Sequence, residues 1–88
     1  MIEKGSIDMK SSVAARYQIM LGPDDVPAFV RAADRCEFDV DISYNSFLVD
    51  AKSIIGVYGL DLSRVLTVYC HGYNEEFDSF LKQFEVAC

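Results

Sequence analysis

The sequence is poor in positive charge, with eight Lys and Arg residues against 14 Asp and Glu, and its formal net charge is −6. This excludes the basic patch with which proteins bind nucleic acid, and it suits a basic partner surface instead. No apolar run approaches the ~20 residues of a membrane span. Residues 1–12 also lack the apolar core of a secretory signal. We therefore expect a cytoplasmic protein with neither nucleic-acid nor membrane partners.

Cysteine and histidine are equally scarce. Cys36, Cys70 and Cys88 are odd in number and lack the spacing of zinc ligands, and His71 is the single histidine. Cys36 and Cys70 fall within apolar periodic segments, where a free thiol behaves as a small hydrophobic side chain. Reduced thiols of this kind fit the cytosol. The sequence predicts no disulfide, no metal site and no cofactor.

What the chain does contain is enough for one small globular domain. Its 88 residues are 51% hydrophobic and 25% charged, which is ordinary globular composition, and a chain of this length builds a single modest core. Residues 1–13 are polar and aperiodic, so we expect a flexible N-terminal tail. Residues 14–88 would form the domain.

Strict alternation of apolar and polar residues predicts four strands. They cover residues 14–21, 37–43, 47–51 and 63–72, and a turn at 44–46 joins the middle two as a hairpin. The apolar face of the sheet would consist of Ile19, Phe38, Val40, Ile42, Leu66 and Val68. The hydrated face would carry Arg16, Gln18, Asp39, Asp41, Thr67, Tyr69 and His71.

Two apolar stripes with the spacing i, i+3, i+4, i+7 predict amphipathic helices that cover the sheet. The stripes consist of Val26, Phe29, Val30 and Ala33, and of Phe77, Phe80, Leu81 and Phe84. Proline is tolerated only in a helix's first turn, so Pro27 places the N-cap of the first helix at Asp24 or Asp25. Asn74 would cap the second. One sheet face is then covered and the other is wet.

Residues 50–62, DAKSIIGVYGLDL, form a short apolar segment between the third and fourth strands. Ser53 is a good N-cap for a helix of about two turns. Apolar residues surround that turn on nearly all sides, and a domain of this size cannot bury them all. We therefore expect an exposed patch, which usually marks a binding surface. Its candidate residues are Ile54, Ile55, Val57 and Tyr58.

This segment closely resembles the serine-site segment of HPr, the histidine-containing phosphocarrier family of the bacterial sugar phosphotransferase system. In that family a Lys-Ser-Ile-x-Gly-Val run opens the short second helix, and a Leu-x-Leu-like sequence closes it. The matching residues here are Lys52, Ser53, Ile54, Gly56, Val57, Leu60 and Leu62. The resemblance extends over residues 14–86. It implies an α+β fold, the HPr-like open-faced β-sandwich, with the order β-α-β-β-α-β-α and a four-stranded antiparallel sheet covered on one face by helices.

The sequence departs from the family at the phosphocarrier site, which is a His at the start of the first helix, within a Gly-Leu-His-Ala-Arg-Pro type sequence. Gly22, Pro23, Asp24 and Asp25 occupy that region here, without His or Arg. A phosphoryl acceptor needs a nucleophilic nitrogen and a nearby cation, and two Asp residues would repel the phosphate. We expect a divergent HPr-like member without catalytic residues that is not an enzyme, with both Asp residues in a structural role at the helix start.

The first possible function is a regulatory docking module. Its partners would be those of sugar transport or carbon regulation: an HPr kinase/phosphorylase, a transcription regulator or an enzyme I-like protein. Docking would use Lys52, Ile54, Ile55, Val57, Tyr58 and the start of the first helix. The resemblance makes Ser53 a candidate for regulatory phosphorylation, with Lys52 in a position to contact the phosphate, although capping alone also explains the serine.

Two alternatives remain open. One is an α/β small-molecule sensor that binds a metabolite at a subunit interface, but the sequence lacks a Gly-rich ligand turn. The other is a phosphocarrier that uses His71, which lies near the end of the last predicted strand. A lone histidine in that position is usually only solvated, and a site requires partner residues.

Overall fold

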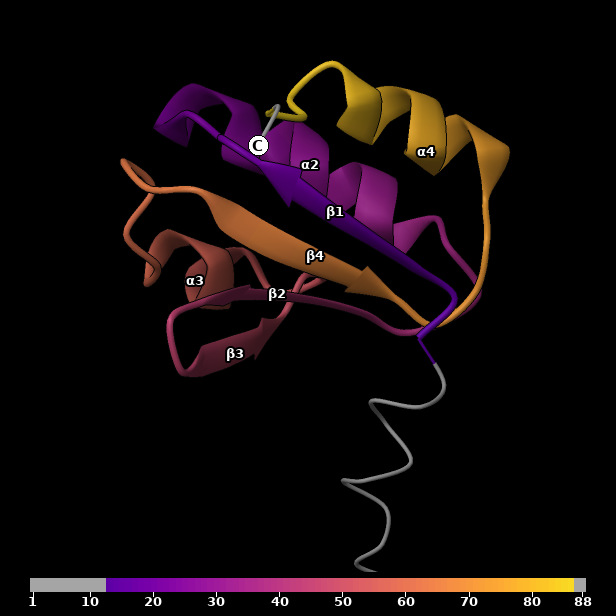
Figure 1. Cartoon of the computed structure of the whole chain (residues 1–88), viewed down its shortest axis with the longest axis horizontal. Helices are drawn as coiled ribbons and strands as arrows, with labels where there is room; N and C mark the ends of the chain where they lie inside the picture. The colour runs from indigo at the N-terminus through magenta and orange to yellow at the C-terminus, as the bar shows by residue number, and fades with distance from the viewer. Residues whose placement is uncertain (1–12, 87–88) are drawn as a thin grey trace, which may run out of the picture.

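The computed structural model describes residues 13–86, so the predicted tail lies outside the described residues apart from Val13, as does Cys88. Four antiparallel strands form one sheet in the order β1-β4-β2-β3 (Figure 1). The strands are β1 (Ala15–Ile19), β2 (Val40–Tyr44), β3 (Phe47–Asp50) and β4 (Leu66–Cys70). The helical elements are η1 (Pro23–Asp25), α2 (Val26–Asp34), α3 (Ile54–Tyr58) and α4 (Glu75–Lys82). This is the predicted open-faced β-sandwich.

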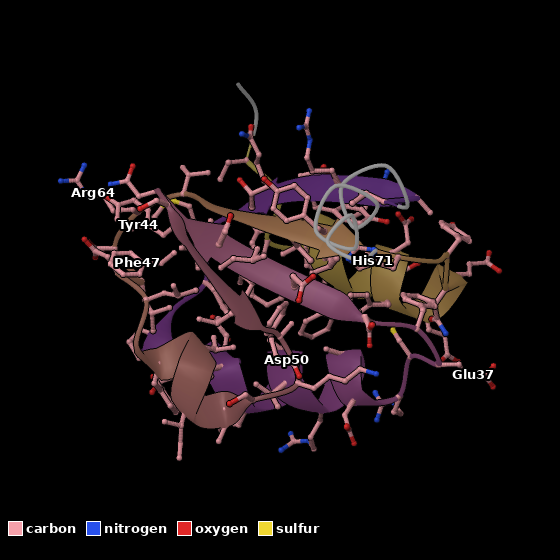
Figure 2. The ribbon with its side chains drawn as sticks, turned by 90° about the horizontal axis from the view of Figure 1, so that it is seen from below. Glu37, Tyr44, Phe47, Asp50, Arg64 and His71 are labelled. Atoms are coloured by element: carbon pink, nitrogen blue, oxygen red, sulfur yellow. The ribbon has the colours of Figure 1, made fainter. Side chains whose placement is uncertain are left out.

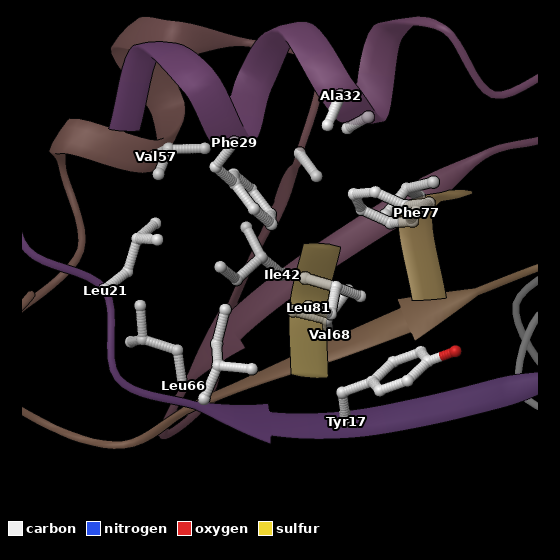
Figure 3. Close-up of a cluster of buried hydrophobic side chains, with 14 of the residues drawn as sticks. Tyr17, Leu21, Phe29, Ala32, Ile42, Val57, Leu66, Val68, Phe77 and Leu81 are labelled. Atoms are coloured by element: carbon white, nitrogen blue, oxygen red, sulfur yellow. The ribbon is translucent and has the colours of Figure 1, made fainter. Parts of the chain in front are cut away.

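The core lies between the sheet and the helices, and the strands alternate as predicted. Ile19, Val40, Ile42, Leu66 and Val68 are all fully buried. Figure 3 shows Phe29 of α2 and Phe77 and Leu81 of α4 packed over this face of the sheet. The hydrophobic effect therefore holds the two layers together through one continuous cluster.

Phe38, the remaining predicted core residue, precedes β2 and is half-buried against the cluster. Its ring lies directly over Gly72, where an added Cβ would be 2.4 Å from Phe38 Cδ2. That separation is far below any real carbon contact, so the aromatic ring can lie there only because residue 72 has no side chain. The pairing of Phe38 with Gly72 closes the end of the core beside β4.

The helix caps agree with the sequence at α4 and differ at α2. Asn74 Oδ1 accepts a hydrogen bond from the Phe77 N–H at 2.8 Å, as predicted. Asp25 occupies the N-cap position of α2 but has helical backbone angles and makes no side-chain cap. The reason is the 3₁₀ turn η1, which begins at Pro23 and already gives the Asp25 N–H a bond to the Gly22 carbonyl. Asp24 and Asp25 instead supply negative charge to this first turn.

The outer edge of β1 is paired, and β3 forms the opposite edge of the sheet. Met20 N–H donates to the Phe84 carbonyl and Val86 N–H to the Gln18 carbonyl, both at 3.0 Å, so the segment after α4 covers β1. Tyr17 also donates its hydroxyl to Asp78 Oδ1 at 2.5 Å, which ties β1 to α4. Within residues 13–86, no helix is long and apolar enough to cross a membrane.

Candidate functional site

The predicted cap of α3 is confirmed. Ser53 has extended backbone angles, and its Oγ accepts a hydrogen bond from the Gly56 N–H at 3.2 Å. A Cβ at Gly56 would lie 3.3 Å from Ser53 Oγ and 3.4 Å from Val49 Cβ. The glycine therefore lets this helix turn lie close to both its cap and β3. Ser53 itself is exposed.

The exposed apolar side chains of α3 form the surface that we call the α3 patch, defined by Ile54, Ile55 and Tyr58. Their exposed fractions are 40%, 82% and 47%. Val57 is fully buried, and Figure 3 shows it beside Phe29 of α2. Its prediction as a docking residue is wrong, because a helix of five residues needs one anchor in the core and Val57 provides it.

Lys52 makes a hydrogen bond that contributes to the fold. Its Nζ donates a hydrogen bond at 3.0 Å to the carbonyl of Cys36, a residue 16 positions earlier that follows the end of α2. A cation at the carbonyl end of a helix is electrostatically favourable. The expected contact between Lys52 and a phosphate on Ser53 would compete with this bond, and the docking role of Lys52 stays a prediction.

The start of α2 lies next to α3, so two regions far apart in the sequence meet. The Tyr58 hydroxyl donates to the Pro23 carbonyl at 3.4 Å. Pro23 and Asp24 are exposed, while Gly22 and Asp25 are half-buried. Met20 and Val65 flank the paired residues Ile19 and Leu66 at this same end of the sheet and are 41% and 43% exposed. This end of the sheet therefore carries exposed apolar side chains in addition to those of the α3 patch.

His71 lies at the opposite end of the sheet from the start of α2. His71 follows Cys70, the last residue of β4, which pairs with Ala15 at the start of β1. The start of α2 follows the other end of β1. The expectation of a merely solvated histidine is also wrong. His71 Nε2 is 3.0 Å from Asp41 Oδ2, and the two side chains are only 13% and 18% exposed.

A hollow of about 480 Å³ lies on the wet face of the sheet beside this pair. Figure 2 views the molecule from the β3 edge of the sheet and labels two residues beside this hollow, Phe47 and His71. The hollow is lined by Val13, Arg16, Asp41, Ser43, Asn45, Ser46, Phe47, Leu48, Tyr69 and His71. Sequence reasoning placed four of these on the hydrated face but missed the hollow, because strand order decides which of them become neighbours.

The two described cysteines, Cys36 and Cys70, are free thiols in the core, as predicted. Burial raises the pKa of Cys70 to about 12 and also raises that of Cys36. Both therefore stay protonated at neutral pH. Among residues 13–86, no cluster of three or more His, Cys, Asp or Glu side chains could hold a metal ion.

Comparison with known proteins identifies the fold. No family model and no curated protein matches the sequence. Among solved structures, the chain is similar to the phosphocarrier protein HPr from Bacillus anthracis str. Ames, with a TM-score of 0.62 and 22% sequence identity. The match covers 82% of this chain and 96% of that one. The domain therefore has the HPr-like fold that the sequence resemblance implied.

Proposed function

We propose that this chain is a regulatory docking module related to the sugar phosphotransferase system, and that it neither carries phosphate nor acts as an enzyme. The observation that supports this most directly is the α3 patch, which places three large apolar side chains in solvent around an exposed serine. An exposed apolar patch usually marks a site of interaction with another protein. The HPr-like fold supplies the class of partner.

The start of α2 is poorly suited to phosphate transfer. Gly22, Pro23, Asp24 and Asp25 offer no side-chain nitrogen, and the two carboxylates stand where a transferred phosphate would need a cation. His71 does not replace the missing acceptor, because it lies at the other end of the sheet with Nε2 engaged by Asp41. Docking without phosphate transfer is therefore the proposed activity.

Ser53 is the proposed regulatory switch of this surface. A kinase would transfer the γ-phosphoryl group of ATP to Ser53 Oγ, with loss of the hydroxyl proton and release of ADP. The phosphate would lie beside the Gly56 N–H, which already donates a hydrogen bond to the Ser53 hydroxyl. It would add about two negative charges next to Ile54. Partners with a basic rim would then bind more tightly, and partners with an acidic rim less tightly.

Phosphorylation assays separate docking from phosphate transfer. With HPr kinase/phosphorylase and ATP, we expect one acid-stable phosphate on the chain, lost in Ser53→Ala. With enzyme I and phosphoenolpyruvate, we expect no phosphate, because the start of α2 lacks an acceptor nitrogen. Intact-mass spectrometry measures both. An acid-labile phosphohistidine that disappears in His71→Ala would contradict the docking proposal, and the absence of any label from ATP would contradict the switch.

The docking surface itself is tested by Ile55→Asp. Ile55 is 82% exposed, so the substitution should leave the fold intact while placing a charge in the centre of the α3 patch. Binding to the HPr kinase/phosphorylase of the same genome should weaken by roughly 2 kcal/mol or more, about 30-fold in Kd. Isothermal titration calorimetry measures the change.

The matched control is Tyr73→Asp, a second exposed apolar residue, which follows β4 at the end of the sheet away from α3. Its effect on Kd should be several-fold smaller. Equal binding by Ile55→Asp and the unmodified chain would show that α3 is not the interface. If Ser53→Asp and Ser53→Ala bind every partner equally while both fold normally, Ser53 is only a helix cap.

A further inference from the structure

The hollow on the wet face is separate from the proposed docking surface, because α3 packs with α2 on the other side of the sheet. Its volume of about 480 Å³ falls within the range of roughly 300–1,000 Å³ typical of small-molecule sites. The β-strands form its floor, and the β2–β3 hairpin supplies Asn45, Ser46, Phe47 and Leu48. A rigid floor with a mixed polar and apolar lining suits a small ligand better than a protein surface.

The floor carries opposite charges on either side of an aromatic ring. Tyr69 of β4 pairs with Arg16 of β1 on one side and with Asp41 of β2 on the other. Paired residues of adjacent strands point to the same face, and neighbouring strands are about 4.8 Å apart, so the Arg16 and Asp41 Cα atoms are separated by roughly 10 Å. Arg16, Tyr69 and Asp41 thus form one row across three strands.

The charges of Arg16 and Asp41 can both interact with a ligand. Between residues 13 and 86, Arg64 pairs with Asp61, and Asp41 is in contact with His71, so no described carboxylate neutralises Arg16. Asp41 is held by His71 at 3.0 Å, which orients it. A carboxylate has about four acceptor positions, so Asp41 can still accept a second donor from a ligand.

The apolar part of the lining lies beside this row. Leu48 pairs with Ser43 and is 49% exposed on the same face. Phe47 at the hairpin is 67% exposed, and Val13 adds a further apolar side chain. Exposed apolar side chains next to the charged row favour a ligand with an apolar body.

We propose that this hollow binds a small zwitterion with an apolar body, of the α-amino-acid type. The ligand carboxylate pairs with Arg16, the ligand ammonium donates to Asp41, and the apolar body lies over Tyr69 and against Leu48. A simple anion would face the Asp41 carboxylate, and a simple cation would face Arg16. Only a ligand with both charges is complementary to the whole row.

The test is a titration of the ¹⁵N-labelled full-length chain with L-phenylalanine, followed by ¹H–¹⁵N correlation spectra. We expect saturable shifts at the amides of Arg16, Asp41, Leu48 and Tyr69, with a Kd in the millimolar range. N-acetyl-phenylalanine and phenylalanine amide each lack one charge and should bind at least 5-fold more weakly. This comparison leaves the protein unchanged, so it does not depend on a variant that folds.

Arg16→Gln and Asp41→Asn should each raise the Kd for L-phenylalanine at least 10-fold, while Arg31→Gln, on exposed α2 surface, should leave it unchanged. The proposal is overturned by the absence of saturable shifts, by shifts centred on other residues, or by equal binding of the singly charged derivatives. Loss of this site would leave the docking proposal intact, since that rests on Ile55 and Ser53.

Discussion

Val57→Asp is expected to unfold the domain, although the other large side chains of this short helix, Ile54, Ile55 and Tyr58, are exposed. Its side chain is fully buried beside Phe29 (Figure 3). A carboxylate at this position would enter the core without a partner, or would force α3 off the sheet. Either outcome should cost more than about 4 kcal/mol, which is a large share of the stability of a domain of this size.

Ile55→Asp, two residues earlier, is the matched control. Its side chain is 82% exposed, so the free energy of unfolding should change by no more than about 0.5 kcal/mol. Urea unfolding followed by circular dichroism measures both variants. If Val57→Asp were as stable as Ile55→Asp, Val57 would not anchor α3 in the core, and its side chain would belong to the exposed α3 patch.

The sheet could be predicted from the sequence because its strands alternate strictly. Val40 and Ile42 lie between polar residues, and a shift of the strand by one residue would have placed both in water. The structure confirms this register, with both side chains fully buried. The cap at Asn74 was equally predictable, since its bond to Phe77 N–H spans only three residues. Local patterns determine these features.

The side of α3 that faces the core could not be predicted in the same way. A helix of five residues, four of them large and apolar, shows no periodicity from which its buried side could be read. The bond from Lys52 to the Cys36 carbonyl was also hidden, because it joins residues 16 positions apart. Only the packing of α3 against α2 decides that Val57 points inward and that Lys52 reaches back to the end of α2.

The hollow depends on strand order, which the alternation of residues does not reveal. Arg16, Tyr69 and Asp41 were all expected on the hydrated face, but they become neighbours only because β4 lies between β1 and β2. The partner of His71 was missed for the same reason, as Asp41 is 30 positions away in the sequence. Polar residues on a wet face thus form a site only when the pairing of strands brings them together.

Alkaline pH should destabilise this protein, because three of its protonated side chains have raised pKa values in the folded state. Cys70 is 2% exposed on the covered face of β4, and burial raises its pKa from 9.0 to about 12. Burial likewise raises the pKa of Cys36, although the charges of Lys52 and Arg35 oppose the shift. The pKa of Tyr17 is raised first by burial and then by its hydrogen bond to Asp78. All three groups are protonated in the folded state at neutral pH.

Alkaline pH lowers the free energy of unfolding because the pKa values of these groups are raised in the folded state. The folded chain binds these protons more tightly than the unfolded chain, so the unfolded state gains free energy by ionising as soon as the pH exceeds its own, lower pKa. The contribution of Cys70 is therefore complete below pH 9 and decreases as the pH rises from 9 to about 12. Each proton contributes about 1.4 kcal/mol per pH unit, so Cys70 alone should cost about 3 kcal/mol by pH 11.

Urea unfolding under reducing conditions at pH 7, 9, 10 and 11 measures this loss, and return to pH 7 checks that it is reversible. Cys70→Ala should be less stable than the unmodified chain at pH 7, because it leaves a small cavity under α4. Its stability should nevertheless decrease less steeply above pH 9, by up to about 1.4 kcal/mol per pH unit. Identical slopes in the two proteins would show that the Cys70 thiol ionises as readily in the folded core as in the unfolded chain.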